Sequence, residues 1–75
     1  MRLTVLGPTG RIGRLVVEQA LEAGHDVTVL ARRRDAFAAS AAPDRLRVVT
    51  GDATDLDAVS AAVDRADAVI SALGP

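Results

Sequence analysis

A glycine-spaced turn between two apolar segments constrains the fold of this chain more than any other feature. The segment at residues 2–6 is dominated by apolar and β-branched residues, as expected of a short buried strand. Three glycines then recur at every third position, and they are Gly7, Gly10 and Gly13. From Arg11 onward the apolar residues follow helical spacing, and Gly24 predicts the end of that helix. The turn therefore joins a strand to the N-terminus of a helix.

The predicted helix has one face that we expect to pack on a sheet and one that we expect to face solvent. Glu18 and Glu22 lie on the solvent face. The expected packing positions follow three-and-four spacing, and they are Ile12, Leu15, Val16, Gln19, Ala20 and Ala23.

The glycine turn has the properties of a pyrophosphate site. A helix N-terminus carries partial positive charge and N–H groups without intrahelical partners, and a phosphate satisfies both. Gly7 can take the sharp turn out of the strand, Gly10 lets the backbone approach the anion, and Gly13 lets the helix pack closely. Thr9 can add a hydroxyl donor, whereas Pro8 has no N–H and only stiffens the turn. This context predicts dinucleotide binding; the alternative is a glycine-rich turn without a ligand.

Three arginines follow the second predicted strand, which spans residues 26–31. In dinucleotide-binding folds the end of this strand lies beside the adenosine ribose, where an acidic residue favours NAD and an arginine favours NADP. Arg32 comes 19 residues after Gly13, close to the expected offset, and no acidic residue occupies its place. We predict NADP, with Arg32 as the first candidate for the 2′-phosphate, Arg33 as the second and Arg34 on the surface. The alternative is a solvated basic loop.

Two further strands and a second helix are predicted in the remainder of the chain. Residues 35–42 are expected to form a short helix or an ordered loop, and a third strand spans residues 46–50. Asp52 follows that strand and has two open interpretations, facing the adenine amino group or hydrogen-bonding within its own turn. Thr54 is the expected helix N-cap. The apolar face of that helix is expected to consist of Leu56, Val59, Ala62 and Val63.

The order of these elements predicts a single α/β domain, residues 1–75, with a Rossmann-type parallel sheet. Right-handed crossovers give the strand order 3-2-1-4 with flanking helices. His25 falls in a turn at the opposite end of the sheet from the glycines, and we expect it to be exposed rather than catalytic. The fourth strand, residues 68–72, forms an apolar edge, which favours association. We expect either that the chain is the front part of a longer protein or that it dimerises through this edge.

Several segments together resemble the N-terminal half of an atypical short-chain dehydrogenase/reductase, in the NAD(P)H-binding branch with NmrA-like regulators and flavin or biliverdin reductases. These segments are residues 7–13, Val-Leu-Ala-Arg at 29–32, Gly51-Asp52-Ala53-Thr54-Asp55 and Asp-Ala-Val-Ile-Ser-Ala-Leu-Gly at 67–74. Pro8 departs from the alanine most common in that family. The resemblance implies that the pyrophosphate is surrounded by Gly7, Thr9, Gly10, Arg11, Ile12 and Gly13. It implies that Arg32 holds the 2′-phosphate. It places Asp52 and Ala53 beside the adenine and Ala72, Leu73 and Gly74 under the ribose on the nicotinamide side.

We therefore expect an NADP-dependent oxidoreductase, or the cofactor-binding half of one, that passes a hydride to a small-molecule or flavin acceptor. The Tyr-x-x-x-Lys pair of short-chain dehydrogenases cannot reside in this chain, which has neither tyrosine nor lysine, and no catalytic residue is assigned. The alternatives are an NmrA-like module that senses NADP(H) without chemistry and a structural fragment that binds nothing.

Composition excludes several classes of function. The net charge of −1 argues against nonspecific nucleic-acid binding. The chain has no cysteine, so it holds neither a disulfide nor a thiolate metal site. No apolar run approaches the roughly 18 residues of a membrane span, and the first apolar run is too short for a signal peptide, so we expect a cytoplasmic protein without membrane partners. All 9 basic residues are arginine, which together with the many alanines favours a GC-rich bacterial genome.

Overall fold

The computed structural model describes residues 1–7, 11–33, 43–52 and 54–71 of the chain. Its elements are β1 (Arg2–Leu6), α1 (Arg11–Glu22), β2 (Asp26–Ala31), the 3₁₀ helix η2 (Pro43–Arg45), β3 (Leu46–Thr50), α2 (Leu56–Val63) and β4 (Ala68–Ser71). The predicted bounds of the first three strands are confirmed. Ala72, which was predicted to end the fourth strand, and the segment 35–42 lie outside the described residues.

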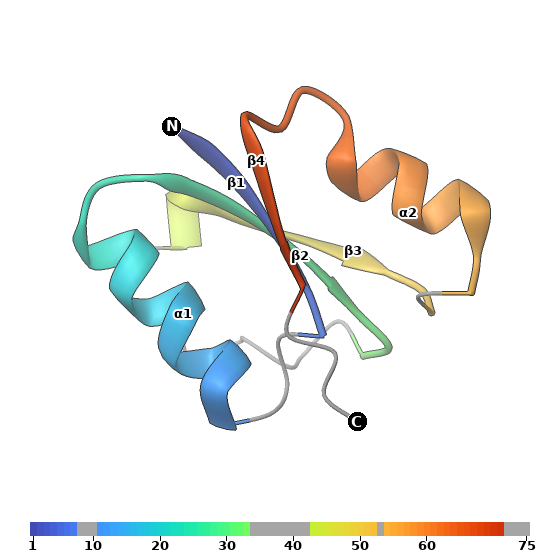
Figure 1. Cartoon of the computed structure of the whole chain (residues 1–75), viewed down its shortest axis with the longest axis horizontal. Coiled ribbons are helices and arrows are strands. Elements are labelled where there is room, and N and C mark those ends of the chain that lie inside the picture. The colour runs from blue at the N-terminus through green and yellow to red at the C-terminus, as the bar shows by residue number, and fades with distance from the viewer. Residues whose placement is uncertain (8–10, 34–42, 53, 72–75) are drawn as a thin grey trace.

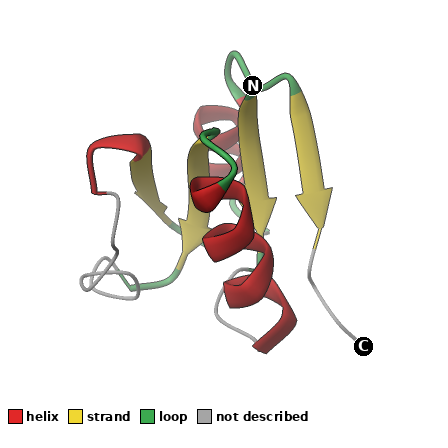
Figure 2. Cartoon of the chain, turned by 90° about the vertical axis from the view of Figure 1, so that its left-hand side faces the viewer, coloured by secondary structure: helices red, strands yellow, loops and turns green. Residues whose placement is uncertain are grey.

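The four strands form one parallel sheet in the order β3-β2-β1-β4. Figure 2 shows them side by side, with their arrows pointing the same way. Leu6 at the end of β1 pairs with Leu30 of β2 and with Ser71 of β4, and Ala31 pairs with Thr50 of β3. This arrangement confirms the predicted Rossmann-type sheet, in which the chain changes direction across the sheet between β1 and β4.

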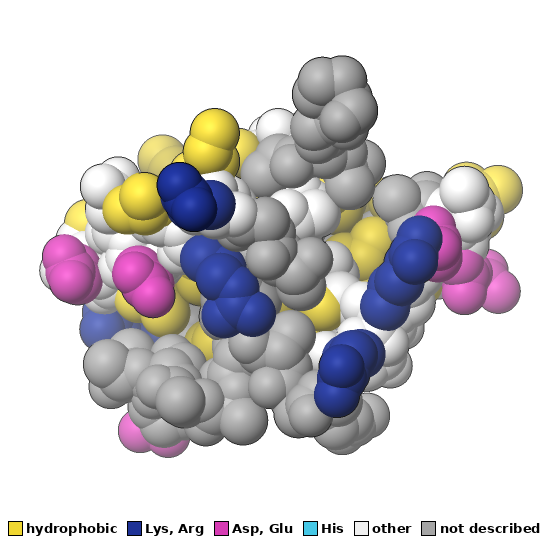
Figure 3. Space-filling view, turned by 90° about the horizontal axis from the view of Figure 1, so that it is seen from below, with side chains coloured by type: hydrophobic (Ala, Val, Ile, Leu, Met, Phe, Trp, Pro, Cys, Tyr) yellow, Lys and Arg dark blue, Asp and Glu magenta, His cyan; other side chains and the backbone are white. Residues whose placement is uncertain are grey.

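The two helices cover opposite faces of the sheet, as Figure 1 shows. Because all four strands run the same way, their carboxyl ends meet at one edge of the sheet. We call this the carboxyl edge, and it is marked by Gly7, Arg32 and Gly51, the residues that follow β1, β2 and β3. The N-terminus of α1 lies at the same edge, which faces the viewer in Figure 3. The opposite edge, where the strands begin, is called the amino edge.

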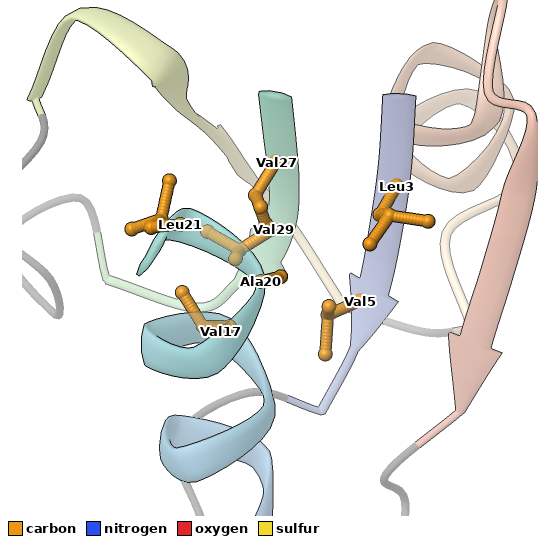
Figure 4. Close-up of a cluster of buried hydrophobic side chains, with 7 residues drawn as sticks. All are labelled: Leu3, Val5, Val17, Ala20, Leu21, Val27 and Val29. Carbon is orange, nitrogen blue, oxygen red and sulfur yellow. The ribbon is translucent and has the colours of Figure 1, made fainter. Parts of the chain in front are cut away.

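The larger part of the core lies between α1 and the sheet. Val17 and Leu21 of α1 belong to one buried cluster with side chains of β1 and β2 (Figure 4). Val5, Val17 and Val29 are completely buried. Alternate residues of the strands face this core because successive side chains of a strand point to opposite faces of the sheet. The other residues of β1 and β2 therefore face α2.

The face of α1 that packs on the sheet differs from the predicted one. Ile12 and Leu15 are 74% and 48% exposed, whereas Gly13, Val17 and Ala20 are buried. The prediction was therefore right for Ala20 and for the half-buried Val16, which packs against the core. It was wrong for Ile12, Leu15, Gln19 and Ala23, which are exposed. Apolar residues surround much of this helix, so helical spacing alone allows more than one packing face. The direction in which α1 crosses β1 and β2 selects among them.

The helix α1 ends in the glycine cap that Gly24 predicts. Gly24 has φ of 90°, and its N–H donates to the Leu21 carbonyl oxygen at 3.0 Å. The His25 N–H donates to the Ala20 carbonyl oxygen at 3.1 Å. These two bonds form a Schellman motif around a left-handed residue. The motif turns the chain into β2 and leaves His25 half-buried, rather than exposed, at the amino edge.

A smaller part of the core lies between the sheet and α2. Ala58 and Ala62 of α2 pack against Leu30 of β2. The helix approaches the end of β3 very closely, since a Cβ added at Gly51 would lie 2.4 Å from the Ala58 Cβ. The buried hydroxyl group of Thr4 donates to the Ala62 carbonyl oxygen at 2.6 Å. Small residues and one hydrogen bond thus hold α2 on the sheet.

The start of α2 and its packing face also differ from the prediction. The N-cap is Asp55, whose carboxylate accepts from the N–H groups of Asp57 and Ala58, so the assignment of Thr54 as the cap was wrong. Leu56 is 80% exposed, which overturns its predicted place in the core, whereas Ala62 is buried as expected. Thr54 instead belongs to the preceding turn. None of the described helices has the length and hydrophobicity of a membrane-spanning segment.

Candidate dinucleotide-binding site

The turn after β1 brings predicted pyrophosphate-binding residues to the carboxyl edge. Gly7 has φ of 73°, a conformation that residues with a side chain rarely adopt. The helix α1 begins at Arg11, and Arg11 and Ile12 are both exposed in its first turn. The N–H groups of this turn have no acceptors within the helix, and the helix dipole adds partial positive charge there. Thr9 and Gly10 lie outside the described residues.

A second group of residues follows the ends of β2 and β3. The Gly51 N–H donates to the Ala31 carbonyl oxygen at 2.9 Å, which joins the two chain segments just beyond the paired strands. Arg32 and Asp52 come next in sequence, and their side chains form an ion pair. The Nη2 atom of Arg32 lies 3.1 Å from Oδ2 of Asp52, with the two side chains 83% and 44% exposed.

Asp52 also organises the turn that leads into α2. Its Oδ1 accepts from the Thr54 N–H at 3.0 Å and from the Thr54 hydroxyl group at 3.2 Å. The Asp55 N–H donates to the Asp52 carbonyl oxygen at 2.9 Å. Of the two interpretations of Asp52, the hydrogen-bonded turn is the one that the structure shows, and a contact to adenine stays a prediction.

The Arg32–Asp52 ion pair was not predicted from the sequence. A signal for it existed, since both residues follow the ends of strands that are neighbours in a sheet of order 3-2-1-4. The carboxyl ends of adjacent parallel strands lie close together, so the two side chains were within reach of each other.

Basic side chains are spread over the carboxyl edge, as Figure 3 shows. Arg11, Arg32 and Arg33 are all exposed there. This distribution favours an anionic ligand. Within the described ranges, no group of three or more His, Cys, Asp or Glu residues could hold a metal ion. The remaining predicted contacts lie outside the described residues, and they are Ala53, Ala72, Leu73 and Gly74.

A groove of about 370 Å³ lies at the amino edge, far from the predicted site. Thr4 and Thr28 contribute to it from the face of the sheet that α2 covers. Its charged residues are Arg2, Asp26, Asp44, Arg45, Arg47, Asp64 and Arg65. Charges of both signs are mixed along this groove, so it does not favour an anion in the way that the carboxyl edge does.

The sequence of residues 7–75 matches a known protein family, described as NAD(P)H-binding. The chain belongs to this NAD(P)H-binding family. It is 44% identical to the 3-diazoavenalumate denitrifying reductase of Streptomyces sp. over 88% of this chain and 20% of that protein. It is 38% identical to the photosystem II assembly factor Ycf39 of Synechocystis sp. over 96% of this chain and 22% of that protein. The chain thus spans about a fifth of the length of these curated relatives.

Solved structures agree with this assignment. The structure described as AtPrR2 with NADP⁺ and (+)pinoresinol is 29% identical, with a TM-score of 0.74 over 97% of this chain and 26% of that chain. Vestitone reductase from alfalfa (Medicago sativa L.) has a TM-score of 0.78 over 93% of this chain and 24% of that chain; at 23% identity it shows the fold alone. These findings confirm the predicted resemblance to the N-terminal part of atypical short-chain dehydrogenase/reductase proteins.

Proposed function

We propose that this chain is the cofactor-binding part of an NADP(H)-dependent oxidoreductase. The observation that carries the proposal is the position of Arg32, exposed beyond the end of β2 at the same edge as the first turn of α1. In dinucleotide-binding folds this position is beside the adenosine ribose, and an arginine there suits a 2′-phosphate. Family membership supports a dinucleotide, and the similarity to a structure described with NADP⁺ supports the phosphorylated form.

Different groups of residues would hold different parts of this cofactor. The first turn of α1 would bind the pyrophosphate through backbone N–H groups, and the positive φ of Gly7 lets the chain turn towards it. Arg32, with Arg33 beside it, would bind the 2′-phosphate through charge-assisted hydrogen bonds. The further proposed contacts are Thr9, Gly10 and Gly13 at the pyrophosphate, Ala53 at the adenine, and Ala72, Leu73 and Gly74 at the ribose on the nicotinamide side.

Bound NADPH supplies a hydride to an acceptor, which we propose to be a small organic molecule or a flavin. Two relatives described as reductases support reductive chemistry. They are the 3-diazoavenalumate denitrifying reductase and a divinyl chlorophyllide a 8-vinyl-reductase of Oryza sativa, which is 41% identical over 76% of this chain. The part of the reaction that we assign to the described residues is to bind and orient the cofactor.

Calorimetric titration of the chain with NADPH and with NADH tests the proposal. A hydrogen bond to a charged group contributes about 1.5–3 kcal/mol, or about 10- to 150-fold in affinity. We therefore expect NADPH to bind at least about 10-fold more tightly than NADH, and Arg32→Ala to remove most of this preference. Arg47→Ala is the matched control, because it removes the same charge from the groove at the amino edge. Equal binding of the two cofactors would contradict the proposal, as would a preference that survives Arg32→Ala.

A regulatory or assembly role is the second candidate. The observation that favours it is the similarity to Ycf39, a photosystem II assembly factor, over nearly the whole chain. A module of this kind would bind NADP(H) and change its affinity for a protein partner without consuming the cofactor. Loss of NADPH absorbance in the presence of candidate acceptors would favour the oxidoreductase. Cofactor-dependent partner binding without any such loss would favour the regulatory role.

A further inference from the structure

A carboxylate lies directly beside the arginine that would bind the 2′-phosphate. We infer that Asp52 is a positioning residue, which orders the Arg32 guanidinium group for the 2′-phosphate of NADP(H). This inference rests on the proposed function and assigns to Asp52 a role in cofactor preference that acts through Arg32. It differs from a direct contact between Asp52 and adenine, because such a contact would serve NAD(H) and NADP(H) alike.

The Asp52 carboxylate is itself held in place by the fold. The Gly51 N–H donates to the Ala31 carbonyl oxygen at 2.9 Å, so the residue before Asp52 is tied to the residue before Arg32. Gly51 also lies against Ala58 of α2, at a distance that leaves no room for a side chain. Both hydrogen bonds from Thr54 go to Oδ1. The other oxygen, Oδ2, is the one that meets Arg32.

The ion pair involves one of the three nitrogens of the guanidinium group, Nη2. Arginine presents five N–H donors, and the contact to Asp52 is made by Nη2. Donors on the other two nitrogens remain available for a phosphate while the ion pair is in place. Without a partner, a side chain that is 83% exposed samples many rotamers and loses that freedom when a ligand binds. The ion pair removes part of this freedom beforehand.

Asp52 also carries a negative charge, which repels a phosphate. Water surrounds both side chains, with 83% and 44% of their surfaces exposed, and it screens this repulsion. The attraction between Asp52 and Arg32 acts over 3.1 Å, whereas a phosphate bound by the other nitrogens of the guanidinium group would lie farther from the carboxylate. We therefore expect ordering to outweigh repulsion.

A double-mutant cycle with Asp52→Asn and Arg32→Ala tests this role. Asparagine keeps the Oδ1 acceptor for Thr54 and removes the charge that meets Arg32. In the parent chain, we expect Asp52→Asn to weaken NADPH binding about 2- to 5-fold, the range of an exposed ion pair, and to leave NADH binding unchanged. In the Arg32→Ala background, we expect Asp52→Asn to change neither affinity. Calorimetric titration gives all of these affinities.

Three results of the cycle would overturn the inference. Equal weakening of NADPH and NADH would indicate an adenine contact or a damaged turn. The same loss in the Arg32→Ala background would show that Asp52 does not act through Arg32. Tighter NADPH binding by Asp52→Asn would show that repulsion outweighs ordering.

An NMR measurement without cofactor separates this inference from the proposed function. The ¹⁵N heteronuclear NOE of the Arg32 Nε–H group reports its order, with Arg47 Nε as the internal reference. We expect a higher value for Arg32 in the parent chain than in Asp52→Asn. Arg32 that is equally mobile in both chains, while NADPH is still preferred, would overturn the role of Asp52 alone. Ordered Arg32 in a chain that does not prefer NADPH would overturn the proposed function, and the role of Asp52 with it.

Discussion

The buried hydroxyl group of Thr4 allows a direct measurement of what one hydrogen bond contributes to holding α2 on the sheet. Thr4 is 1% exposed, and its Oγ1 donates to the Ala62 carbonyl oxygen at 2.6 Å. This carbonyl lies in the last turn of α2, where backbone acceptors lack helical partners. Its helical partner would be the Ala66 N–H, which donates to Val63 instead, at 3.0 Å. Thr4→Val keeps the shape of the side chain and leaves the Ala62 carbonyl without its donor.

A buried acceptor without a partner costs about 1–3 kcal/mol, and the additional methyl group of valine offsets about 0.8 kcal/mol of this. We therefore expect Thr4→Val to lower the free energy of unfolding by about 0.2–2.2 kcal/mol. For a domain of this size, each kcal/mol changes the melting temperature by about 4–8 °C, so we expect a decrease of about 1–18 °C.

Thermal unfolding followed by circular dichroism measures this effect, with Thr28→Val as the matched control. Thr28 is the register partner of Thr4 on the same face of the sheet and is half-buried. Within the described part of the chain, its side chain makes no hydrogen bond. We expect the control to keep or slightly raise the melting temperature. The reasoning would be refuted if Thr4→Val were as stable as the parent, or if both variants lost the same amount.

Three further variants test other features of the fold. Gly51→Ala should destabilise the chain by about 1–3 kcal/mol in urea unfolding, because the new Cβ would lie 2.4 Å from the Ala58 Cβ. A loss of stability below about 0.5 kcal/mol would mean that α2 moves aside freely. Asp55→Ala should lower the free energy of unfolding by about 1 kcal/mol, and Thr54→Ala by less than half of that, since Asp55 is the N-cap of α2. A larger loss for Thr54→Ala than for Asp55→Ala would make Thr54 the cap. Val69 is 49% exposed on β4. If the chain dimerises through this edge, sedimentation velocity should show a dimer for the parent and a monomer for Val69→Lys. A monomeric parent would contradict dimerisation through β4, one of the two alternatives expected from the sequence.

The strands were easier to predict than the faces of the helices. Runs such as residues 26–31 combine β-branched residues with a turn at one end and charged residues at the other, so their bounds follow from local sequence. The packing face of α1 does not follow from local sequence, since Ile12 and Leu15 are apolar yet exposed while Val17 is buried. A helix with apolar residues on several sides has no packing face defined by periodicity alone, because the partner surface decides which side is covered.

Local sequence sets the order of the helices and strands and the position of the arginines. The three-residue spacing of Gly7, Gly10 and Gly13 and the place of Arg32 directly after the second strand are properties of neighbouring residues, and they led to a Rossmann-type fold and a dinucleotide. Which residues far apart in sequence come into contact depends on the three-dimensional packing of the strands. Arg32 and Asp52 are 20 residues apart in sequence, and they form an ion pair because the parallel pairing of β2 with β3 brings the two strand ends together. Contacts of this kind depend on sheet register, which no local pattern specifies.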